Sequence, residues 1–438
     1  MLLRRPRIQG RAAALPYQQG EEFCPAPESP LLDFAGFVGY VEAVSFLREF
    51  EALRIEELLE LSRNTGAADA RQAAGKTLLT PSDFARLISP AAAGECLEDI
   101  CRRSQAMTRR RFGKVIRLFA PLYLSNECIN NCKYCGFSRD NAILRVTLNV
   151  EEVLREARAL KEQGFRNILL VSGEHPKFVS GGYMADCIRA LHAEVPSISL
   201  EIGPMETAEY LPLAEAGADG LVVYQETYDR GLYAEMHTAG PKRNFDWRLE
   251  TPERAYAAGF RRLGIGALYG FGDWRREAIC LAAHAAHLLR HCWKAQLTVS
   301  LPRLRPCAGQ FQPPAPMSDR DLTQLVCALR LYLPDAGLVL STREAPQLRD
   351  GLIPLGITMI SAGSHTEPGG YTGAGREKLH HTERGRIVEL AAGASEWAEG
   401  ATGQFEIADP RSSGEVAALL QRLGYEPVWK DWDAALTA

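Results

Sequence analysis

The sequence predicts an α/β protein built on a (β/α)8 barrel of the TIM type, with a helical extension before the barrel and a second extension after it. From residue 119 onward, eight short apolar runs alternate with stretches long enough for a helix, which is typical of a parallel sheet. Eight repeats within about 250 residues favour a closed barrel. The runs end in polar or glycine-rich residues such as Ser125-Asn126 and Ser341-Thr342, and barrels build their active sites at these ends. Periodicity alone leaves a doubly wound open sheet as the alternative.

The first segment, residues 1–30, is expected to be variable and disordered. Its first 22 residues contain four arginines and no acidic residue before Glu21, a composition also found in organelle transit peptides. We favour the first interpretation, without organelle targeting, because serines and an amphipathic pattern are missing there.

Residues 31–117 are expected to form a helical region that precedes the barrel. The stretch "LTPSDFARLIS" (79–89) offers Thr80 as an N-cap and Pro81 at the first helical position. Two or three helices are therefore expected before the first strand.

The barrel itself is expected to span residues 118–371. Its strand candidates lie at 119–126, 167–174, 198–205, 220–227, 262–270, 296–303, 337–344 and 356–363. The segments between them, such as 150–164, are amphipathic and end at a glycine, as helices do.

Residues 372–438 are expected to form a loop and a docking helix. The stretch 372–403 is rich in glycine and charge and has no strand pattern, so we expect a surface loop or short helices there. A capped helix and an aromatic end that docks on the barrel are expected to follow.

Composition argues against several classes of function. The 438 residues include 50 basic and 54 acidic side chains, a net charge of -4, so neither nucleic acid nor a membrane is expected as a partner. No apolar run approaches the ~20 residues of a membrane-spanning helix. We expect a cytoplasmic bacterial protein.

The eleven cysteines do not form a disulfide pattern, because their number is odd and their spacings are irregular. Those in helical patterns are expected to be buried apolar residues: Cys96, Cys101, Cys187, Cys280, Cys292 and Cys327.

Three cysteines stand apart, directly after the first strand candidate. Cys128, Cys132 and Cys135 have the spacing C-x3-C-x2-C. Thiolates suit zinc, copper(I) and iron–sulfur clusters. A structural zinc site usually needs four protein ligands, whereas three cysteines leave one iron of a four-iron cluster open to a small molecule. The residues favour this open cluster, with a zinc loop and a redox pair at Cys132 and Cys135 as alternatives.

This loop resembles the cluster motif of the radical S-adenosylmethionine (SAM) enzymes, with the aromatic Tyr134 before the last cysteine. Ser172-Gly173-Glu174 resembles their Gly-Gly-Glu motif, which holds the SAM amino group; Ser172 departs from the usual first glycine.

A closer resemblance is to the 2-iminoacetate synthases, the tyrosine lyases of bacterial thiamine biosynthesis. It rests on "PLYLSNECINNCKYCGFS", "LLVSGEH", "VYQETY", "GIGALYGFGDWR", "PRLRPC", "STRE" and "PGGY" in this order, and covers roughly residues 78–373 and 403–435. The long N-terminus and the segment around 374–402 depart from the family. Neither is expected to touch a motif.

The resemblance implies cleavage of the Cα–Cβ bond of L-tyrosine to 2-iminoacetate (dehydroglycine) and p-cresol, with 5′-deoxyadenosine and methionine from SAM, for the thiazole moiety of thiamine. It implies a [4Fe-4S] cluster on Cys128, Cys132 and Cys135, a reducing electron donor, and thiazole synthase as a partner. Rival activities are a tryptophan lyase and the tyrosine lyase of hydrogenase maturation. The latter holds a second cluster on C-terminal cysteines, and this sequence has none after Cys327.

Polar residues at the strand ends are the candidates for contacts to substrate and SAM. A substrate carboxylate favours a bidentate arginine, and the catalytic candidates are Arg303, Arg305, Ser341 and Arg343. An outward salt bridge is the alternative for the arginines. The candidates for SAM are Tyr123, Ser125, Asn126, Gly173, Glu174, Gln225, Glu226, Gly264 and Gly266. Asn126 could instead cap the loop.

Three histidines, His284, His287 and His291, recur at helical spacing and resemble a zinc patch. A partly exposed helix face outside the barrel is the favoured interpretation.

Overall fold

The computed structural model describes residues 45–383, 385–390 and 400–429. The predictions for residues 1–30 therefore lie outside the described part of the chain. So do those for the end of the chain from residue 430 onward.

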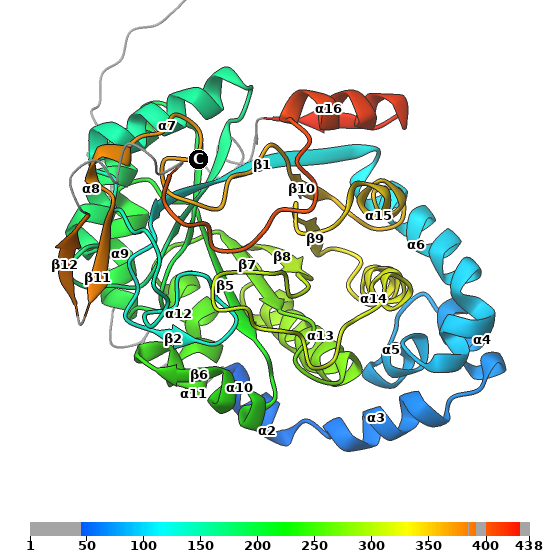
Figure 1. Ribbon diagram of the computed structural model, residues 1–438. Coiled ribbons are helices and arrows are strands. Elements are labelled where there is room, and N and C mark those ends of the chain that lie inside the picture. The colour runs from blue at the N-terminus through cyan, green and yellow to red at the C-terminus, as the bar shows by residue number, and fades with distance from the viewer. Residues whose placement is uncertain (1–44, 384, 391–399, 430–438) are drawn as a thin grey trace, which may run out of the picture.

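Eight parallel strands close into a barrel (Figure 1), in the order β1-β3-β4-β5-β7-β8-β9-β10 with β10 paired back to β1. Their bounds are β1 Val115–Ser125, β3 Asn167–Ser172, β4 Ser197–Glu201, β5 Gly220–Glu226, β7 Arg262–Ala267, β8 Gln296–Ser300, β9 Gly337–Leu340 and β10 Met359–Ser361. Each overlaps one predicted run. The register Leu118↔Ile360 closes the ring, which rules out the open doubly wound sheet.

Helices surround the strands as an outer ring (Figure 1). They are α7 Val150–Glu162, α8 Gly181–His192, α9 Thr207–Glu215, α12 Thr251–Ala257, α13 Trp274–His291, α14 Asp319–Tyr332 and α15 Pro346–Leu352. Local sequence sets their ends: Asn149 and Glu152 form a capping box at the start of α7. Between β5 and β7 lie the short helices α10 Arg230–Met236 and α11 Phe245–Leu249, and strand β6 His237–Ala239, which pairs with β2 Asn131–Cys132.

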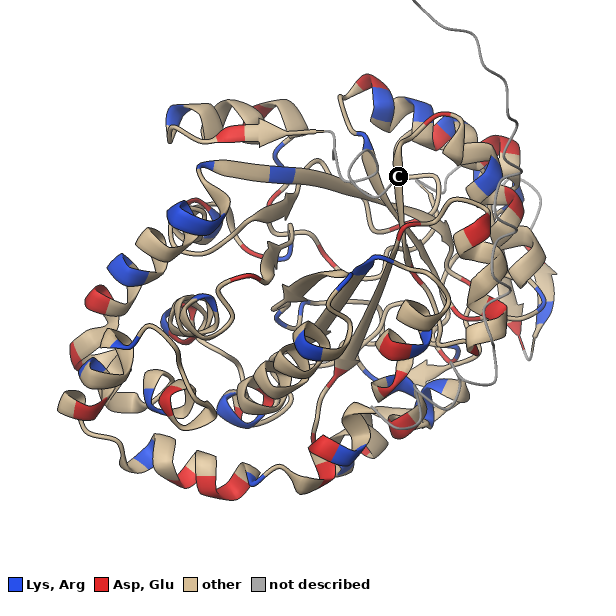
Figure 2. Ribbon diagram, turned by 180° about the vertical axis from the view of Figure 1, so that it is seen from behind, with Lys and Arg blue, Asp and Glu red and all other residues tan. Residues whose placement is uncertain are grey.

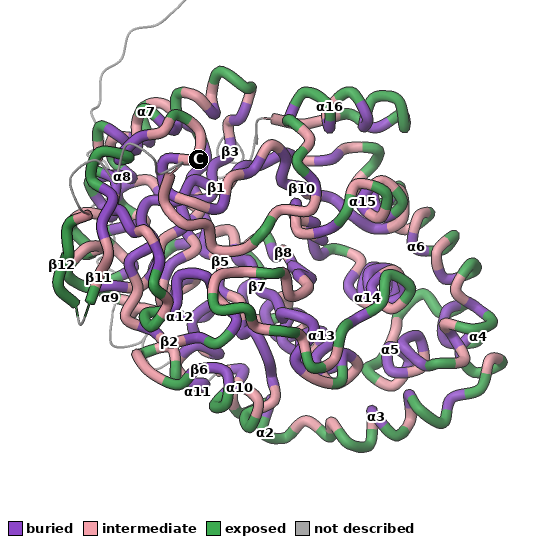
Figure 3. The backbone as a smooth tube through the Cα atoms, viewed as in Figure 1, coloured by how far each residue is buried: buried purple, intermediate pink, exposed green. Residues whose placement is uncertain are grey.

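The helical region before the barrel comprises α2 Phe46–Ala52, α3 Ile55–Asn64, α4 Ala67–Gly75, α5 Pro81–Leu87, the π-helical turn Ala92–Cys96 and α6 Leu97–Phe112. Thr80 caps α5 as predicted: its side chain accepts from the amide of Asp83, and Asp83 accepts from the amide of Thr80. One hydrophobic core joins this region to the barrel and to the C-terminal helix, with Phe46, Ile100 and Val416 among its members. Figure 3 shows buried backbone continuing from the strands into these helices. The division of the chain at residues 117 and 371 stays a prediction.

The segment after the barrel contains a hairpin that the sequence analysis missed. Strands β11 His380–Glu383 and β12 Arg386–Glu389 pair antiparallel, so the expectation of a loop or short helices is wrong here. Each strand has only four residues; β11 is entirely polar and β12 places Ile387 next to Val388, so neither shows the alternation of a strand. Gly385, with φ +75°, makes the turn. Helix α16 Ser413–Arg422 and strand β13 Glu426–Val428 follow, and β13 pairs with the start of β1.

The surface matches the balanced composition. Basic and acidic segments are interspersed over the outer helices (Figure 2). Among the described residues, no helix has the length and apolar character needed to span a membrane.

Candidate active site

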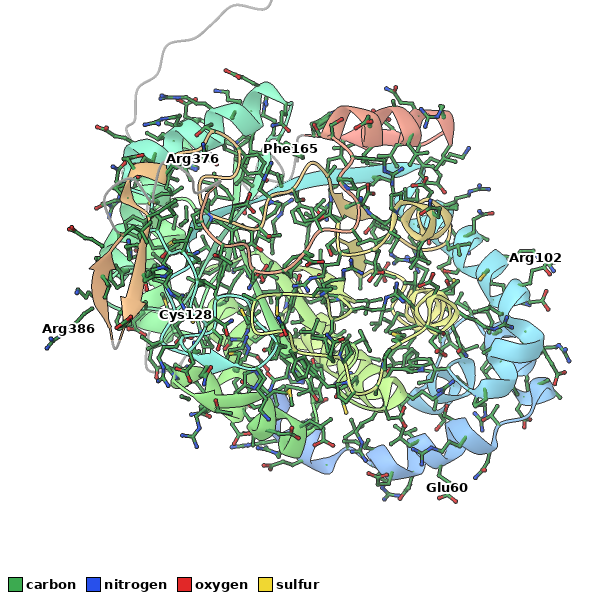
Figure 4. The ribbon with its side chains drawn as sticks, in the orientation of Figure 1. Glu60, Arg102, Cys128, Phe165, Arg376 and Arg386 are labelled. Carbon is green, nitrogen blue, oxygen red and sulfur yellow. The ribbon has the colours of Figure 1, made fainter. Side chains whose placement is uncertain are left out.

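Cys128 (Figure 4), Cys132 and Cys135 lie in the segment that follows the carboxyl end of β1. Cys132 and Cys135 are drawn together by a turn in which the Cys135 amide donates to the Cys132 carbonyl at 3.2 Å. Amide side chains face two of the sulfurs: Nδ2 of Asn130 lies 3.7 Å from Cys128 Sγ, and Nε2 of Gln404 lies 3.8 Å from Cys135 Sγ. The loop therefore presents soft ligands together with N–H donors that stabilise thiolate charge.

Burial controls the protonation of these thiols. It raises the pKa of Cys128 and of Cys132, and raises that of Cys135 to about 11, while the Lys242 ammonium acts in the opposite direction. The thiols are neutral without a metal, so a soft metal centre binds by displacing their protons. This donor set fits an iron–sulfur cluster.

A buried arginine holds the loop in place. The guanidinium of Arg145 donates to the carbonyls of Asn126, Phe137 (3.2 Å) and Ser138 (2.8 Å). The Asn126 side chain donates to the carbonyl of Leu144 at 2.9 Å. Asn126 therefore stabilises the loop through its side chain, in line with the alternative that it caps the loop.

Glycines allow backbone segments to approach this loop closely. A Cβ at Gly173 would overlap the carbonyl oxygen of Glu127, and one at Gly136 would lie 2.6 Å from the carbonyl oxygen of Gln404. Gly173 donates its amide to Ser125 O at 2.9 Å. The glycine of the Ser-Gly-Glu motif therefore lets the backbone after β3 pack directly against the backbone of the cysteine loop.

Glu174 reaches across to the same loop. Its Oε2 accepts from Nδ2 of Asn130 at 2.7 Å, and its side chain packs where Gly203 has no Cβ. A cavity of about 350 Å³ opens beside it, lined by Gly173, Glu174 and His175 among others.

The end of β5 carries a strained acidic residue. Glu226 has φ 71°, which is costly for a residue with a side chain. Its carboxylate pairs with Lys242 Nζ at 2.6 Å and Arg248 Nη2 at 3.6 Å. Burial raises the pKa of Glu226, but these two cations outweigh burial and hold it below its usual value. Gln225 is also buried and donates its Nε2 to the carbonyl of Phe245, on α11, at 3.3 Å.

A second cavity lies inside the barrel, above the packed strands. Its lining includes Tyr123, Glu201, Tyr224, Ser341 and Arg343. Arg343 stacks on the ring of Phe405 at 3.4 Å, and Tyr123 donates its hydroxyl to Gln404 Oε1 at 2.8 Å. Burial, together with the charge of Glu226, raises the pKa of Glu201 to about 7. The cavity wall therefore contains both a guanidinium group and a carboxyl group with a raised pKa.

Glycines on β7 allow close packing against β5, which contributes Tyr224 to this cavity. A Cβ at Gly266 would lie 2.8 Å from the ring of Tyr224, and one at Gly264 would lie 2.8 Å from Val222. These glycines make room for the neighbouring strand's side chains inside the barrel.

The two arginines after β8 differ in their surroundings. β8 ends at Ser300, so both lie in the loop that follows. Arg303 forms ion pairs with Glu344 and with Asp319 (2.8 Å). Nε of Arg305 is buried and has no hydrogen-bond partner in the described ranges.

The segment around 374–402, which departs from the family pattern in sequence, contacts the cysteine loop. His380 Nε2 lies 2.8 Å from Oε1 of Glu127, beside Cys128, and the Thr382 hydroxyl donates to the same oxygen at 2.6 Å. The expectation that this segment touches no motif is therefore wrong.

Sequence analysis missed several residues of this site: Glu127, Arg145, Glu201, Lys242, Arg248 and Gln404. Glu201 had a visible signal, a lone carboxylate within the apolar run 198–205. Gln404 had none, because only the fold brings it to Tyr123 and Cys135.

The Ser125 side chain contacts Thr147: the two hydroxyl oxygens lie 2.7 Å apart. The pairing of β1 with β3 shifts register between Tyr123 and Ser125.

Known proteins resemble this chain over most of its length. Residues 122–282 match the Radical SAM superfamily, and residues 300–426 match the Biotin and Thiamin Synthesis associated domain. The 2-iminoacetate synthase of Escherichia coli (strain K12) is 43% identical over 371 residues, 84% of this chain and 92% of that relative. The 2-iminoacetate synthase of Salmonella typhimurium (strain LT2) is 41% identical over 84% of this chain and 92% of that relative. The solved structure of the FeFe-hydrogenase maturase HydG from Carboxydothermus hydrogenoformans matches with a TM-score of 0.71 and 32% identity, covering 91% of this chain and 84% of that one.

Proposed function

Because this chain belongs to the radical SAM enzymes of the 2-iminoacetate synthase family, we propose that its barrel mouth binds SAM against the cysteine loop and L-tyrosine in the adjoining cavity. The protein is a carbon–carbon lyase. It cleaves the Cα–Cβ bond of L-tyrosine to 2-iminoacetate and p-cresol and converts SAM to methionine and 5′-deoxyadenosine, for the thiazole moiety of thiamine.

Cys128, Cys132 and Cys135 would hold the [4Fe-4S] cluster. When bound, the cluster would supply the electron needed for the reductive cleavage of SAM, the source of the radical chemistry of this family. The chain's own task is to orient and shield the reactants. The amides of Asn130 and Gln404 stabilise charge on the sulfurs.

SAM would be held by groups at the ends of β3 and β5. Glu174 is fixed by Asn130 and is positioned to accept hydrogen bonds from the SAM ammonium. Lys242 and Arg248, which already form ion pairs with Glu226, would face the carboxylate of SAM. Ser125 and Asn126 would act by shaping the cysteine loop. Gly264 and Gly266 would act by leaving space for the side chains of Val222 and Tyr224.

Tyrosine would be held by Arg343, Ser341 and Arg305. Arg343 lines the cavity, and the unpartnered Nε of Arg305 is a donor that a substrate carboxylate would satisfy. Arg303 already forms ion pairs with Glu344 and Asp319, so we assign it a structural role. The observation that carries this assignment is that one cavity is lined by both the guanidinium of Arg343 and the carboxyl group of Glu201.

We further propose that thiazole synthase receives the unstable imine and that a small reductant protein supplies electrons in the cytoplasm. This rests on the reactivity of the product and on the electron that the cluster needs. Co-purification of thiazole synthase with the full chain would support it, and the absence of any complex at high protein concentration would contradict it.

Product analysis tests the proposed substrate. The cluster-loaded enzyme is incubated anaerobically with SAM, dithionite and either L-tyrosine or L-tryptophan. We expect glyoxylate, the hydrolysis product of 2-iminoacetate, together with p-cresol from tyrosine only. An indole product from tryptophan, or carbon monoxide and cyanide from tyrosine, would assign one of the rival activities instead.

A further inference from the structure

Two helices far from the barrel mouth meet at a cluster of metal-ligating side chains. Helix α2 packs on α13 (Figure 1) and covers the histidine face that the sequence analysis expected to be partly exposed. His284 and His287 are buried there, and His291 is half-buried. Glu49 of α2 faces the last two.

The ligand atoms already lie close together. One ligand atom each of Glu49, His287 and His291 fall within 4.8 Å of one another. Glu49 Oε1 is 3.0 Å from His287 Nδ1 and 3.6 Å from His291 Nε2. The histidines are four residues apart on one helix, a spacing that places both rings on the same face.

A second carboxylate orients the buried histidine from behind. Among the described residues, Nε2 of His287 has no hydrogen-bond partner, and it lies 3.5 Å from Oε1 of Glu253, which accepts from the Phe46 amide. Histidine ligands of metals usually donate their other ring N–H to a carboxylate, which fixes the ring and makes it a better ligand. Oε2 of Glu253 is likewise buried with no partner in the described part of the chain, so this carboxylate retains an unused acceptor.

The electrostatics of the cluster favour a cation. The carboxylates of Glu49 and Glu253 flank the His287 ring, at 3.0 Å from Nδ1 and 3.5 Å from Nε2. Arg290 also pairs with Glu49, through Oε2 at 2.7 Å. A divalent ion bound through Oε1 of Glu49 would leave Arg290 on the other carboxylate oxygen.

We propose that Glu49, His287 and His291 form a zinc site that fastens helix α2 to helix α13. Two imidazoles and one carboxylate are the ligand types that zinc takes, and three protein ligands leave a fourth position for water. Glu49 and His291 are partly exposed, at 43% and 33% of their side chains, so the ion can enter from solvent.

The test measures zinc bound to the cluster-loaded enzyme under anaerobic conditions. Calorimetric titration with zinc chloride is followed by metal analysis of the desalted protein. We expect one zinc per chain with no loss of iron, and a higher melting temperature with zinc. In His291→Asn the affinity should fall at least about 10-fold, and in Glu253→Gln by about 10- to 100-fold.

Two control variants separate ligation from a plain ion-pair network. Arg290→Gln removes the competing cation but keeps all three ligands, so zinc affinity should be equal or higher. His192→Asn changes an exposed histidine on α8 and should change nothing. Zinc affinity that is the same in His291→Asn as in the wild type would overturn the proposal, as would a wild-type enzyme that retains its iron and binds no zinc.

Discussion

At the residue scale, the arginines near the barrel mouth have separable roles. Arg303 neutralises Glu344, whose side chain is only 4% exposed, whereas Arg343 lines the cavity. Removing a partner from a buried charge costs stability, and removing a donor from a substrate carboxylate costs binding. Substitution of Arg303 should therefore lower the stability of the protein, whereas substitution of Arg343 should weaken the binding of tyrosine.

We predict that Arg343→Gln raises the KM for tyrosine by about 10- to 100-fold, the value of one or two charge-assisted hydrogen bonds, with an unchanged melting temperature. Arg303→Gln should instead lower the free energy of unfolding by about 1–3 kcal/mol and leave KM within a few-fold. Steady-state kinetics and thermal melts of the two variants check this. The reverse pattern would exchange their roles.

Glu201 predicts a dependence of stability on pH. Its pKa in the folded protein is about 7, above the usual range for glutamate, so the folded state binds the proton more tightly than the unfolded state. Its stabilising contribution is present below the unfolded pKa and is lost as pH rises through 7.

Glu201→Gln should therefore gain stability relative to the wild type between pH 5 and pH 8, by about 1–2 kcal/mol after allowing for partial solvent access. Denaturant unfolding at the two pH values measures the difference. Glu162→Gln, an exposed site on α7, is the control. An equal change at both pH values in Glu201→Gln would refute the assigned pKa.

At the scale of elements, the cysteine loop depends on segments far apart in sequence. The turn after β3 supports it through Gly173 and Glu174, and the hairpin β11–β12 supports it through His380 and Thr382. Sequence motifs identified Gly173 and Glu174 as candidates for SAM binding, but neither contact with the cysteine loop was predicted. The hairpin's strands have four residues each, so their pairing depends on tertiary contacts that a local pattern does not record.

Substitution of Gly173 should disrupt the contact between the backbone after β3 and the cysteine loop. In Gly173→Ala the new Cβ would overlap the carbonyl of Glu127, so β3 or the loop must shift. We expect the variant to fold but to hold less than half of the wild-type iron after reconstitution, as read by metal analysis and visible absorbance. Gly181→Ala, where a Cβ meets nothing within 4 Å, should keep its iron. Full iron content in both variants would show that this close approach does not matter.

At the scale of the whole molecule, closure of the barrel brings the strand ends together at one mouth. The eight strands could be predicted because each is an apolar run followed by a helix-length segment. The site was only partly predictable: Tyr123, Ser341 and Arg343 do line one cavity, but Gln404 comes from beyond the barrel. Its place depends on how the C-terminal segment crosses the mouth, and no local pattern encodes that crossing.

The central claim is that the three cysteines hold the radical-generating cluster of a tyrosine lyase. The most direct measurement is the joint yield of 5′-deoxyadenosine and p-cresol from anaerobic enzyme with SAM, dithionite and tyrosine, in the wild type and in Cys132→Ala. We predict both products in the wild type and neither in the variant. Deoxyadenosine without p-cresol, or both products from Cys132→Ala, would contradict the claim.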